Sequence, residues 1–424
     1  MPTLTPTEPL IAHCQSCGAE VPPDSDHCPS CGRLVRERST KITVALTLLM
    51  IFAGVLLTQA FVNLHRTTEI SLARRWFTRG EEAMQAKAPK YAAQDYRTAL
   101  NYDQENDYYR LRLSEALLAD NRLAEARAHL LSLWEEEPAN GEVNLALARV
   151  DAKRGHYNDA VRYYNDAING VWQKNPRHAR TAARFELARY LLQQQQTARA
   201  QAELLALLAD APSDPGDLLL LGNMLLKVNE PAHALQAYTA LLSKDNRNAQ
   251  AWVGESQVYL ALANYADAEH TAAKAVQSDP KLEDARQQLE LTRAILRIDP
   301  ALRGLTVAER TNRAAEAFSS ALTRLSACAA QKNIHLTDSS GAAGGGNANP
   351  AVAPPNDLQL LYTSGLQKLP QATAQALRRD PDALEPAMQY VFEVERTTAT
   401  ICPNMDVTDR ALLTLAQHEN EAVK

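Results

Sequence analysis

Small and large apolar residues recur with a period of about 34 residues, typical of a helical repeat, through the middle of the chain. Six alanines follow this spacing, and only the interval between the third and the fourth is longer: Ala92, Ala126, Ala160, Ala200, Ala234 and Ala268. After each of the first five, a large residue stands four positions later, and another apolar residue follows at the seventh position. This spacing puts all three on one face of a helix. The period predicts an all-α fold of helix pairs stacked into a solenoid.

The repeats resemble the tetratricopeptide repeat family, whose units of about 34 residues are pairs of helices. The sixth unit matches best, with Trp252, Tyr259, Ala268, Ala275 and Pro280 at family positions. The resemblance implies about six helix pairs within residues 73–282, and six extra residues separate the third pair from the fourth. The expected units are 73–106, 107–140, 141–174, 181–214, 215–248 and 249–282. A cap and a following helix over 283–332 would close the solenoid.

The resemblance also implies a concave groove, formed by the first helix of each unit, that binds proteins or peptides. The predicted groove residues are Arg149, Lys153, Phe185, Arg189, Asn223 and Lys227. Their cations are suited to an acidic side chain or a terminal carboxylate. The alternative is that these charges only solvate the surface.

Residues 42–64 contain no charge over 23 positions. A helix of that length spans about 34 Å, which exceeds the roughly 30 Å of a hydrocarbon layer. The run therefore predicts a single transmembrane helix. A cleavable signal peptide is the alternative, because small residues at Thr58 and Ala60 are typical of a cleavage site.

The charges beside the apolar run predict its orientation. Arg33, Arg36, Arg38 and Lys41 precede it closely, whereas Arg66 is the only cation in the nine residues that follow. Positive residues stay on the cytoplasmic side, so we expect the amino terminus in the cytoplasm and the repeats on the outer, periplasmic or extracytoplasmic side. The arrangement is typical of a bacterial inner-membrane protein.

Four cysteines are concentrated near the amino terminus, as two Cys-x-x-Cys pairs: Cys14, Cys17, Cys28 and Cys31. Residues 11–33 thereby resemble the small zinc-ribbon family, which implies a structural Zn²⁺ held by four thiolates. Disulfides and a redox Cys-x-x-Cys are the alternatives. We expect His13 and His27 to be bystanders. The ribbon's acidic residues argue against nucleic-acid binding.

The carboxyl-terminal region resembles no family. Thr306 and Glu309 form a predicted capping box for a helix to about residue 332. Residues 337–357 have the composition of a flexible linker, and 358–424 contain three predicted short helices, near 358–368, 382–398 and 407–422. Cys328 and Cys402 could form a disulfide in an oxidising compartment, or remain as two buried thiols.

The remaining features narrow the class of function. A net charge of −6 and a pI near 6.0 provide no general attraction for nucleic acid. The sequence contains no catalytic motif, so we expect no catalytic residues, no small-molecule substrate and no enzyme. Four histidines near the repeats, His156, His178, His233 and His270, have no evident carboxylate or cysteine arrangement. The sequence predicts a membrane-anchored adaptor. The alternative is a transmembrane regulator whose ribbon contacts nucleic acid or a cytoplasmic enzyme.

Overall fold

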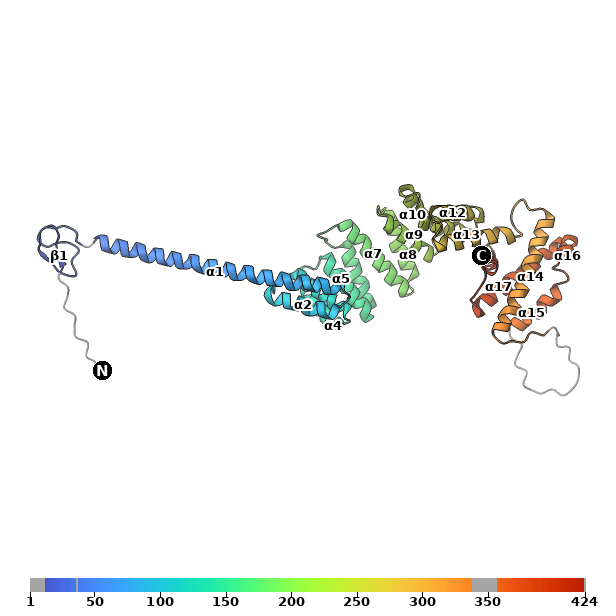
Figure 1. The fold of residues 1–424 in the computed structure, drawn as a ribbon, viewed down its shortest axis with the longest axis horizontal. Helices are drawn as coiled ribbons and strands as arrows, with labels where there is room; N and C mark the ends of the chain where they lie inside the picture. The colour runs from blue at the N-terminus through green and yellow to red at the C-terminus, as the bar shows by residue number, and fades with distance from the viewer. Residues whose placement is uncertain (1–11, 36, 338–356, 423–424) are drawn as a thin grey trace, which may run out of the picture. The chain divides into compact units, whose positions relative to one another are not determined.

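The computed structural model describes residues 12–35, 37–337 and 357–422. The chain folds into two compact units, Met1–Val171 and Trp172–Lys424. The boundary between them lies near the end of the third predicted repeat, a few residues before the six extra residues. Both units are built from helices, and the only sheet in the described part is a short hairpin (Figure 1).

The first unit begins with that hairpin. Strands β1 (Ala12–His13) and β2 (Glu20–Val21) pair antiparallel, with Ala12 opposite Val21. Only Cys14, Val21 and Cys28 form the small buried cluster behind it. A core of this size cannot hold the segment folded by apolar burial alone.

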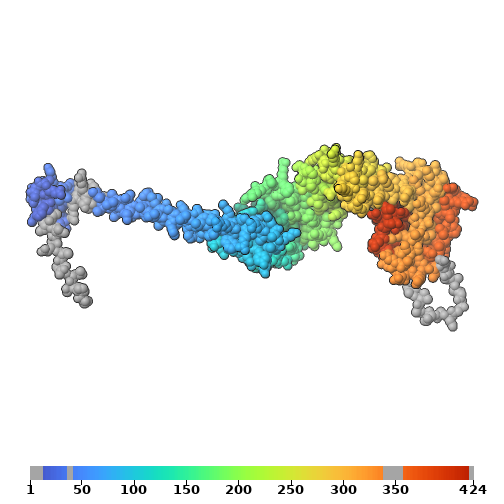
Figure 2. Space-filling model, viewed as in Figure 1, coloured from blue at the N-terminus to red at the C-terminus, as the bar shows by residue number. Residues whose placement is uncertain are grey.

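Helix α1 (Glu37–Gln85) is continuous over 49 residues and has two different parts. Figure 2 shows no other helix of the described residues covering its apolar first part. Large side chains are uncovered there, with Leu49 62% and Leu57 71% exposed. From Ala73 onward it packs against α2 (Pro89–Tyr102), and Ala73 is fully buried. The ring of Phe77 stacks on that of Tyr109, with 4.5 Å between centroids. The same helix is therefore both the uncovered apolar rod and the first member of the first helix pair.

The other helices of the first unit follow the predicted repeats. They are α3 (Asp107–Ala119), α4 (Leu123–Glu136), α5 (Gly141–Arg154) and α6 (Tyr157–Asn169). The side chains of Asn106 and Asn140 begin α3 and α5 by accepting backbone N–H groups that have no partner inside the helix. Three of the repeating alanines, Ala92, Ala126 and Ala160, are fully buried where second helices meet their neighbours.

The second unit contains three more helix pairs and a further helix. They are α7 (Pro176–Gln193), α8 (Thr197–Ala209), α9 (Pro215–Lys227), α10 (Pro231–Lys244), α11 (Ala249–Ala261), α12 (Tyr265–Ser278) and α13 (Glu283–Ile298). Ala200, Ala234 and Ala268 are again fully buried. The predicted all-α fold of stacked helix pairs is therefore confirmed.

The carboxyl-terminal helices share one core with the last repeat. They are α14 (Val307–Gln331), α15 (Asp357–Lys368), α16 (Ala374–Arg379), the 3-10 helix η1 (Pro381–Ala383), α17 (Leu384–Ile401) and α18 (Val407–Ala422). Both reciprocal hydrogen bonds of the capping box at Thr306 and Glu309 are present, which confirms that prediction. The sequence did not predict α16. Most of the predicted linker at 337–357 lies outside the described residues.

Candidate functional site

The four amino-terminal cysteines meet at the hairpin. Each Cys-x-x-Cys pair turns at the following glycine, Gly18 or Gly32, whose φ angles are +76° and +71°. The N–H groups of these glycines donate to the carbonyl oxygens of Cys14 and Cys28, both at 2.8 Å. L-residues with a side chain rarely adopt this left-handed conformation, so glycine permits the tight knuckle.

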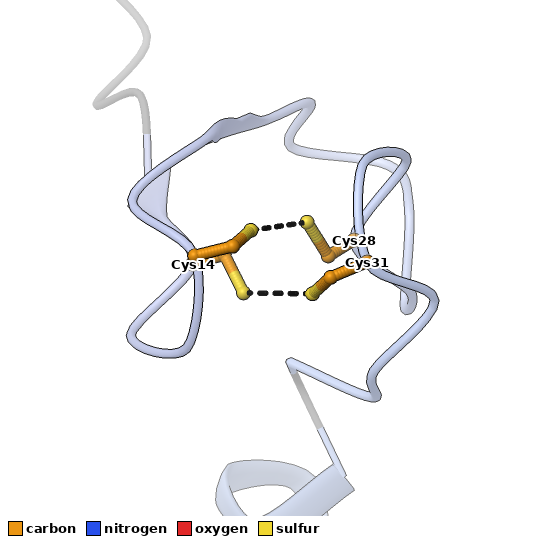
Figure 3. A group of neighbouring side chains, drawn as sticks. Cys14, Cys28 and Cys31 are labelled. Atoms are coloured by element: carbon orange, nitrogen blue, oxygen red, sulfur yellow. Dashed lines mark hydrogen bonds between the residues drawn. The ribbon is translucent and has the colours of Figure 1, made fainter.

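Figure 3 shows the side chains of Cys14, Cys28 and Cys31 pointing into the space between the two Cys-x-x-Cys turns. Sγ of Cys14 lies 3.6 Å from Sγ of Cys31, and Sγ of Cys17 lies 3.4 Å from Sγ of Cys28. All four atoms lie within 4.8 Å of one another. Cys14 and Cys28 are buried, whereas Cys17 and Cys31 are exposed.

The electrostatics at Cys14 favour the loss of its proton. The backbone N–H of Ser16, with smaller contributions from Cys17 and the neighbouring thiols, lowers the pKa of the Cys14 thiol to about 6 because these groups stabilise the thiolate. The contacts with Cys28 and Cys31, by contrast, raise the pKa of Cys17. Four sulfur donors in this arrangement fit a tetrahedral ion such as Zn²⁺, which is usually bound by thiolates at structural sites. His13 and His27 are exposed and do not belong to the group of four donors.

Helix α1 contains a stretch that could cross a membrane. Within Ile42–Gln85, an 18-residue window has a mean hydropathy of 2.2 and is 0% buried. By length and composition this one helix is long and apolar enough to span a bilayer.

Two of the predicted groove residues lie on α5 of the first unit. Arg149 is partly exposed, and its charge lies close enough to influence the carboxyl of Glu115. Lys153 is exposed, and its Nζ donates to the carbonyl oxygen of Leu118 at 3.2 Å. Both side chains therefore lie beside α3, the first helix of the preceding pair.

The other predicted groove residues belong to the second unit. Arg189 on α7 and Asn223 and Lys227 on α9 are exposed. Phe185 is only 3% exposed, because it packs in the core between helices. Phe185 was expected as part of the apolar floor of the groove, and whether it contacts a partner stays a prediction. Asn223 accepts a hydrogen bond from the hydroxyl of Tyr238 at 2.7 Å.

A charged network in the first unit was not predicted from the sequence. Glu81 on α1 accepts two hydrogen bonds from the Arg112 guanidinium, both at 2.9 Å, and one from the hydroxyl of Tyr96. Arg112 also pairs with Glu115. These side chains tie α1 to α3 and hold the Glu81 carboxylate in place. Spacing in the sequence gives no signal for partners that lie on different helices so far apart in the chain.

Three of the four repeat histidines have carboxylate neighbours, which corrects the sequence interpretation; His178 is close enough to influence the Asp217 carboxyl. Nδ1 of His233 lies 2.7 Å from Glu230, and Nδ1 of His156 lies 3.6 Å from Asp151. Glu230 is three residues before His233 at the start of α10. Side chains three residues apart on a helix are neighbours, so this contact could have been predicted from the sequence.

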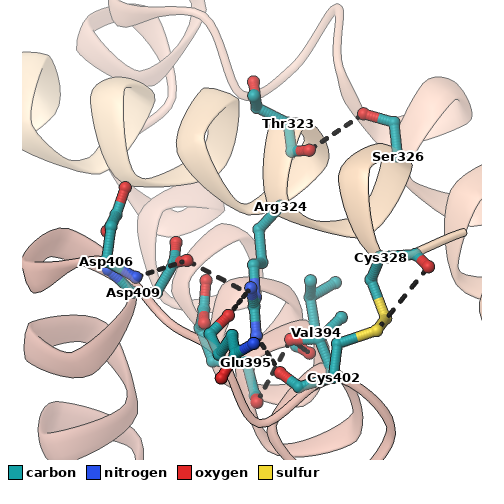
Figure 4. Close-up of polar contacts among 11 residues, drawn as sticks. Thr323, Arg324, Ser326, Cys328, Val394, Glu395, Cys402, Asp406 and Asp409 are labelled. Atoms are coloured by element: carbon teal, nitrogen blue, oxygen red, sulfur yellow. Dashed lines mark hydrogen bonds and ion pairs between the residues drawn. A yellow bond between two sulfur atoms is a disulfide. The ribbon is translucent and has the colours of Figure 1, made fainter. Parts of the chain in front are cut away.

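The carboxyl-terminal cysteines are joined. A disulfide links Cys328 on α14 to Cys402 at the end of α17, with 5.8 Å between Cα atoms (Figure 4). Beside it, the Arg324 guanidinium donates to the carbonyl oxygens of Cys402 and of Asn404, the latter at 2.6 Å. Its Nε lies 3.4 Å from a carboxylate oxygen of Asp409 at the start of α18. One arginine therefore holds the turn between α17 and α18 against α14.

Glu395 is the unusual member of this neighbourhood. It is 0% exposed, and neither carboxylate oxygen has a hydrogen-bond partner among the described residues. Burial, together with the like charge of Asp409, raises its pKa to about 8. A protonated carboxyl group is therefore the form that this site accommodates at neutral pH.

Comparison with known proteins identifies the type of repeat. Residues 117–169, which run from the end of α3 through α6, match the tetratricopeptide repeat. No curated protein sequence matches the chain.

Several solved structures are similar at low identity. YrrB, a tetratricopeptide repeat protein with an unusual peptide-binding site, is 18% identical, with 46% of this chain and 97% of YrrB covered and a TM-score of 0.35. PilF of Pseudomonas aeruginosa is 15% identical, with 52% of this chain and 97% of PilF covered and a TM-score of 0.37. PilW, a type IV pilus biogenesis factor, is 17% identical, with 51% of this chain and 98% of PilW covered and a TM-score of 0.39. By sequence, the tetratricopeptide type is identified for residues 117–169.

Proposed function

We propose that this chain is a membrane-anchored adaptor: its repeats bind protein partners on the outer side of a membrane, and a structural zinc ribbon lies on the cytoplasmic side. The proposal includes no catalytic step. The single observation that supports it best is helix α1, whose uncovered apolar part continues without a break into the first helix pair.

The uncovered apolar surface supports the membrane anchor. A soluble protein rarely exposes a contiguous apolar surface of more than a few hundred Å². In α1, Met50 is 73% exposed and Phe61 69% exposed, and neither has a covering helix among the described residues. A hydrocarbon layer provides the cover that such side chains need.

The cysteines support the proposed orientation. The four cysteines before the apolar part are unpaired, whereas Cys328 and Cys402 after it form a disulfide. Free thiolates persist in a reducing compartment, and disulfides persist in an oxidising one. The two groups of cysteines therefore suit opposite sides of a membrane, in agreement with the cations that precede residue 42.

Cations at the surface of first helices support the binding of acidic protein segments. The partly exposed Arg149 and the exposed Lys153 offer such a surface in the first unit, and Arg189 and Lys227 offer one in the second. Side chains of this kind form charge-assisted hydrogen bonds with carboxylates.

Protease protection in sealed inner-membrane vesicles tests the anchor. We expect an epitope before residue 11 and an epitope after residue 424 to be cleaved from opposite sides of the membrane. Cleavage of both epitopes from the same side would contradict the orientation, and recovery of the full chain in the soluble fraction would contradict the anchor.

Crosslinking in intact membranes tests the adaptor function. We expect Arg149→Glu and Arg189→Glu each to reduce the yield of crosslinked partner proteins several-fold, because the charge reversal repels carboxylates. Lys90→Glu on α2 and Arg199→Glu on α8 are matched controls, since both cations are exposed on second helices of the pairs. Equal yields from all four variants would contradict binding through these surfaces.

A further inference from the structure

A cleft of about 550 Å³ opens in the second unit where the last repeat meets the carboxyl-terminal helices. Its residues come from the start of α12, the turn after α13, the first part of α14, and helices α17 and α18. Pockets of this volume are large enough to hold one or two side chains of a bound peptide. The predicted groove residues are not part of this cleft.

The inner surface of the cleft is apolar. Met388 and Phe392 project from α17, and Leu415 projects from α18. Their exposed fractions are 5%, 9% and 7%, so each is anchored in the surrounding core. A floor of this kind favours a large apolar side chain, since its burial removes apolar surface from water.

A contact between distant segments fixes one wall. The hydroxyl of Tyr265, at the start of α12, shares a hydrogen bond of 2.8 Å with Nδ1 of His418 on α18. The two rings lie 5.9 Å apart between centroids. The wall therefore has a defined position before any ligand binds, which lowers the entropic cost of binding.

The charges around the cleft are mostly acidic. Asp299, Glu385 and Glu419 line it, and Arg310 is the one guanidinium among the lining residues. The Asp299 carboxylate accepts the backbone N–H of Ala301 at 2.8 Å and is buried, whereas Glu385 is exposed. Asp299 is buried close to Arg313. Glu385 and Glu419 are therefore the carboxylates that remain at the rim, against Arg310, and they favour a positively charged ligand.

We propose that this cleft binds a partner protein through a segment in which a large apolar side chain is flanked by lysine or arginine. The apolar side chain occupies the floor formed by Met388, Phe392 and Leu415, and the flanking cations pair with Glu385 and Glu419. This inference rests on the proposed adaptor function and gives it a second binding surface. It differs in charge from the basic surfaces on the first helices, which suit acidic segments.

Fluorescence anisotropy with labelled peptides tests the proposal on the purified full chain in detergent. The probe is the peptide Gly-Lys-Phe-Lys-Gly, capped at both ends. We expect it to bind at least tenfold more tightly than Gly-Glu-Phe-Glu-Gly, which reverses the charges, and than Gly-Lys-Ala-Lys-Gly, which removes the ring. Equal affinities for the three peptides would overturn the proposal without the need for any variant.

Variants of the rim locate the binding. We expect Glu385→Lys to lower the affinity for the Lys-Phe-Lys peptide at least tenfold and Glu385→Gln to lower it less. Arg310→Gln should raise this affinity. Glu393→Lys is the matched control, because Glu393 is exposed on the same helix outside the cleft. An unchanged affinity in Glu385→Lys and Glu385→Gln would overturn the assignment. Since the peptides require no native partner, failure here leaves the crosslinking test of the adaptor function unaffected.

Discussion

The ring of Tyr238 fills the space that a side chain would need at Gly222: a Cβ atom added there would lie 2.6 Å from Cε1 of the ring. Tyr238 is fully buried, and its ring also blocks a Cβ atom at Gly254 on the next first helix. One tyrosine of a second helix thus packs between two first helices that contain no side chain at the contact. Its hydroxyl is held by Asn223.

We expect Gly222→Ala to destabilise the second unit. Alanine gains about 1 kcal/mol of helix propensity over glycine, but overpacking against a buried ring costs roughly 1–3 kcal/mol and more when the ring cannot move. The apparent Tm, followed by circular dichroism, should fall by a few degrees. In a Tyr238→Leu background the same change should stabilise the protein, because the ring is gone. A rise in Tm in both backgrounds would show that the ring adjusts to the added methyl group.

From the cluster of four cysteines we expect one zinc ion per chain, measured by elemental mass spectrometry on the purified protein. We expect Cys14→Ser and Cys31→Ser each to lose most of the bound zinc, because a tetrahedral site needs all four thiolates. His27→Ala and Cys328→Ser are the controls and should keep the full content. Zinc lost from His27→Ala as well would mean that the imidazole is a ligand.

The disulfide predicts a stability that depends on reductant. It closes a loop with a sequence separation of 74 residues, for which the chain-entropy relation gives about 4 kcal/mol. We expect the double variant Cys328→Ser/Cys402→Ser to unfold at a lower urea concentration than the native chain. Dithiothreitol should shift the native chain to the same midpoint and leave the double variant unchanged. A native midpoint that does not respond to dithiothreitol would mean that the bond contributes nothing to stability.

Glu395 predicts a loss of stability towards alkaline pH. Its pKa is raised to about 8 in the folded chain, above the value near 4.3 of an unfolded glutamate. Between these values the folded state binds more protons than the unfolded state. The unfolding equilibrium constant should therefore rise by up to about tenfold per pH unit and level off above pH 8. Asp406 and Asp409 reinforce the shift, and Arg324 opposes it.

Urea unfolding at pH 5, 6.5 and 8 measures this dependence. We expect Glu395→Gln to flatten it, because glutamine is neutral at every pH. Glu393→Gln, exposed on the same helix, should retain the native dependence. An identical pH profile for Glu395→Gln and the native chain would assign the dependence to other groups.

The sequence predicted the features that repeat or lie close together along the chain. All six alanines of the repeat are fully buried, since a regular spacing reports a regular packing position. The capping box at Thr306 could be predicted because its partner, Glu309, is only three residues away in the sequence. The four cysteines also needed only their spacing, since each pair forms its own knuckle.

Features that depend on distant residues could not be predicted. Glu395 lies in an amphipathic helix, where a lone glutamate is usually on the solvent side, and only the approach of α14 and α18 buries it. The pairing of Glu81 with Arg112 also arises from packing between helices. The short helix α16 was missed because six residues are too few for a periodic pattern.

The unbroken course of α1 has a mechanical consequence. If residues 42–64 span the bilayer, only about 14 Å of helix separates Leu64 from Ala73, the first buried residue of the repeats. A helix resists bending over so short a distance, so a tilt or rotation of the anchor would turn the first helix pair with it. The anchor then acts as a rigid stalk that fixes the distance and the orientation of the first helix pair relative to the lipid surface. A flexible linker would leave both variable.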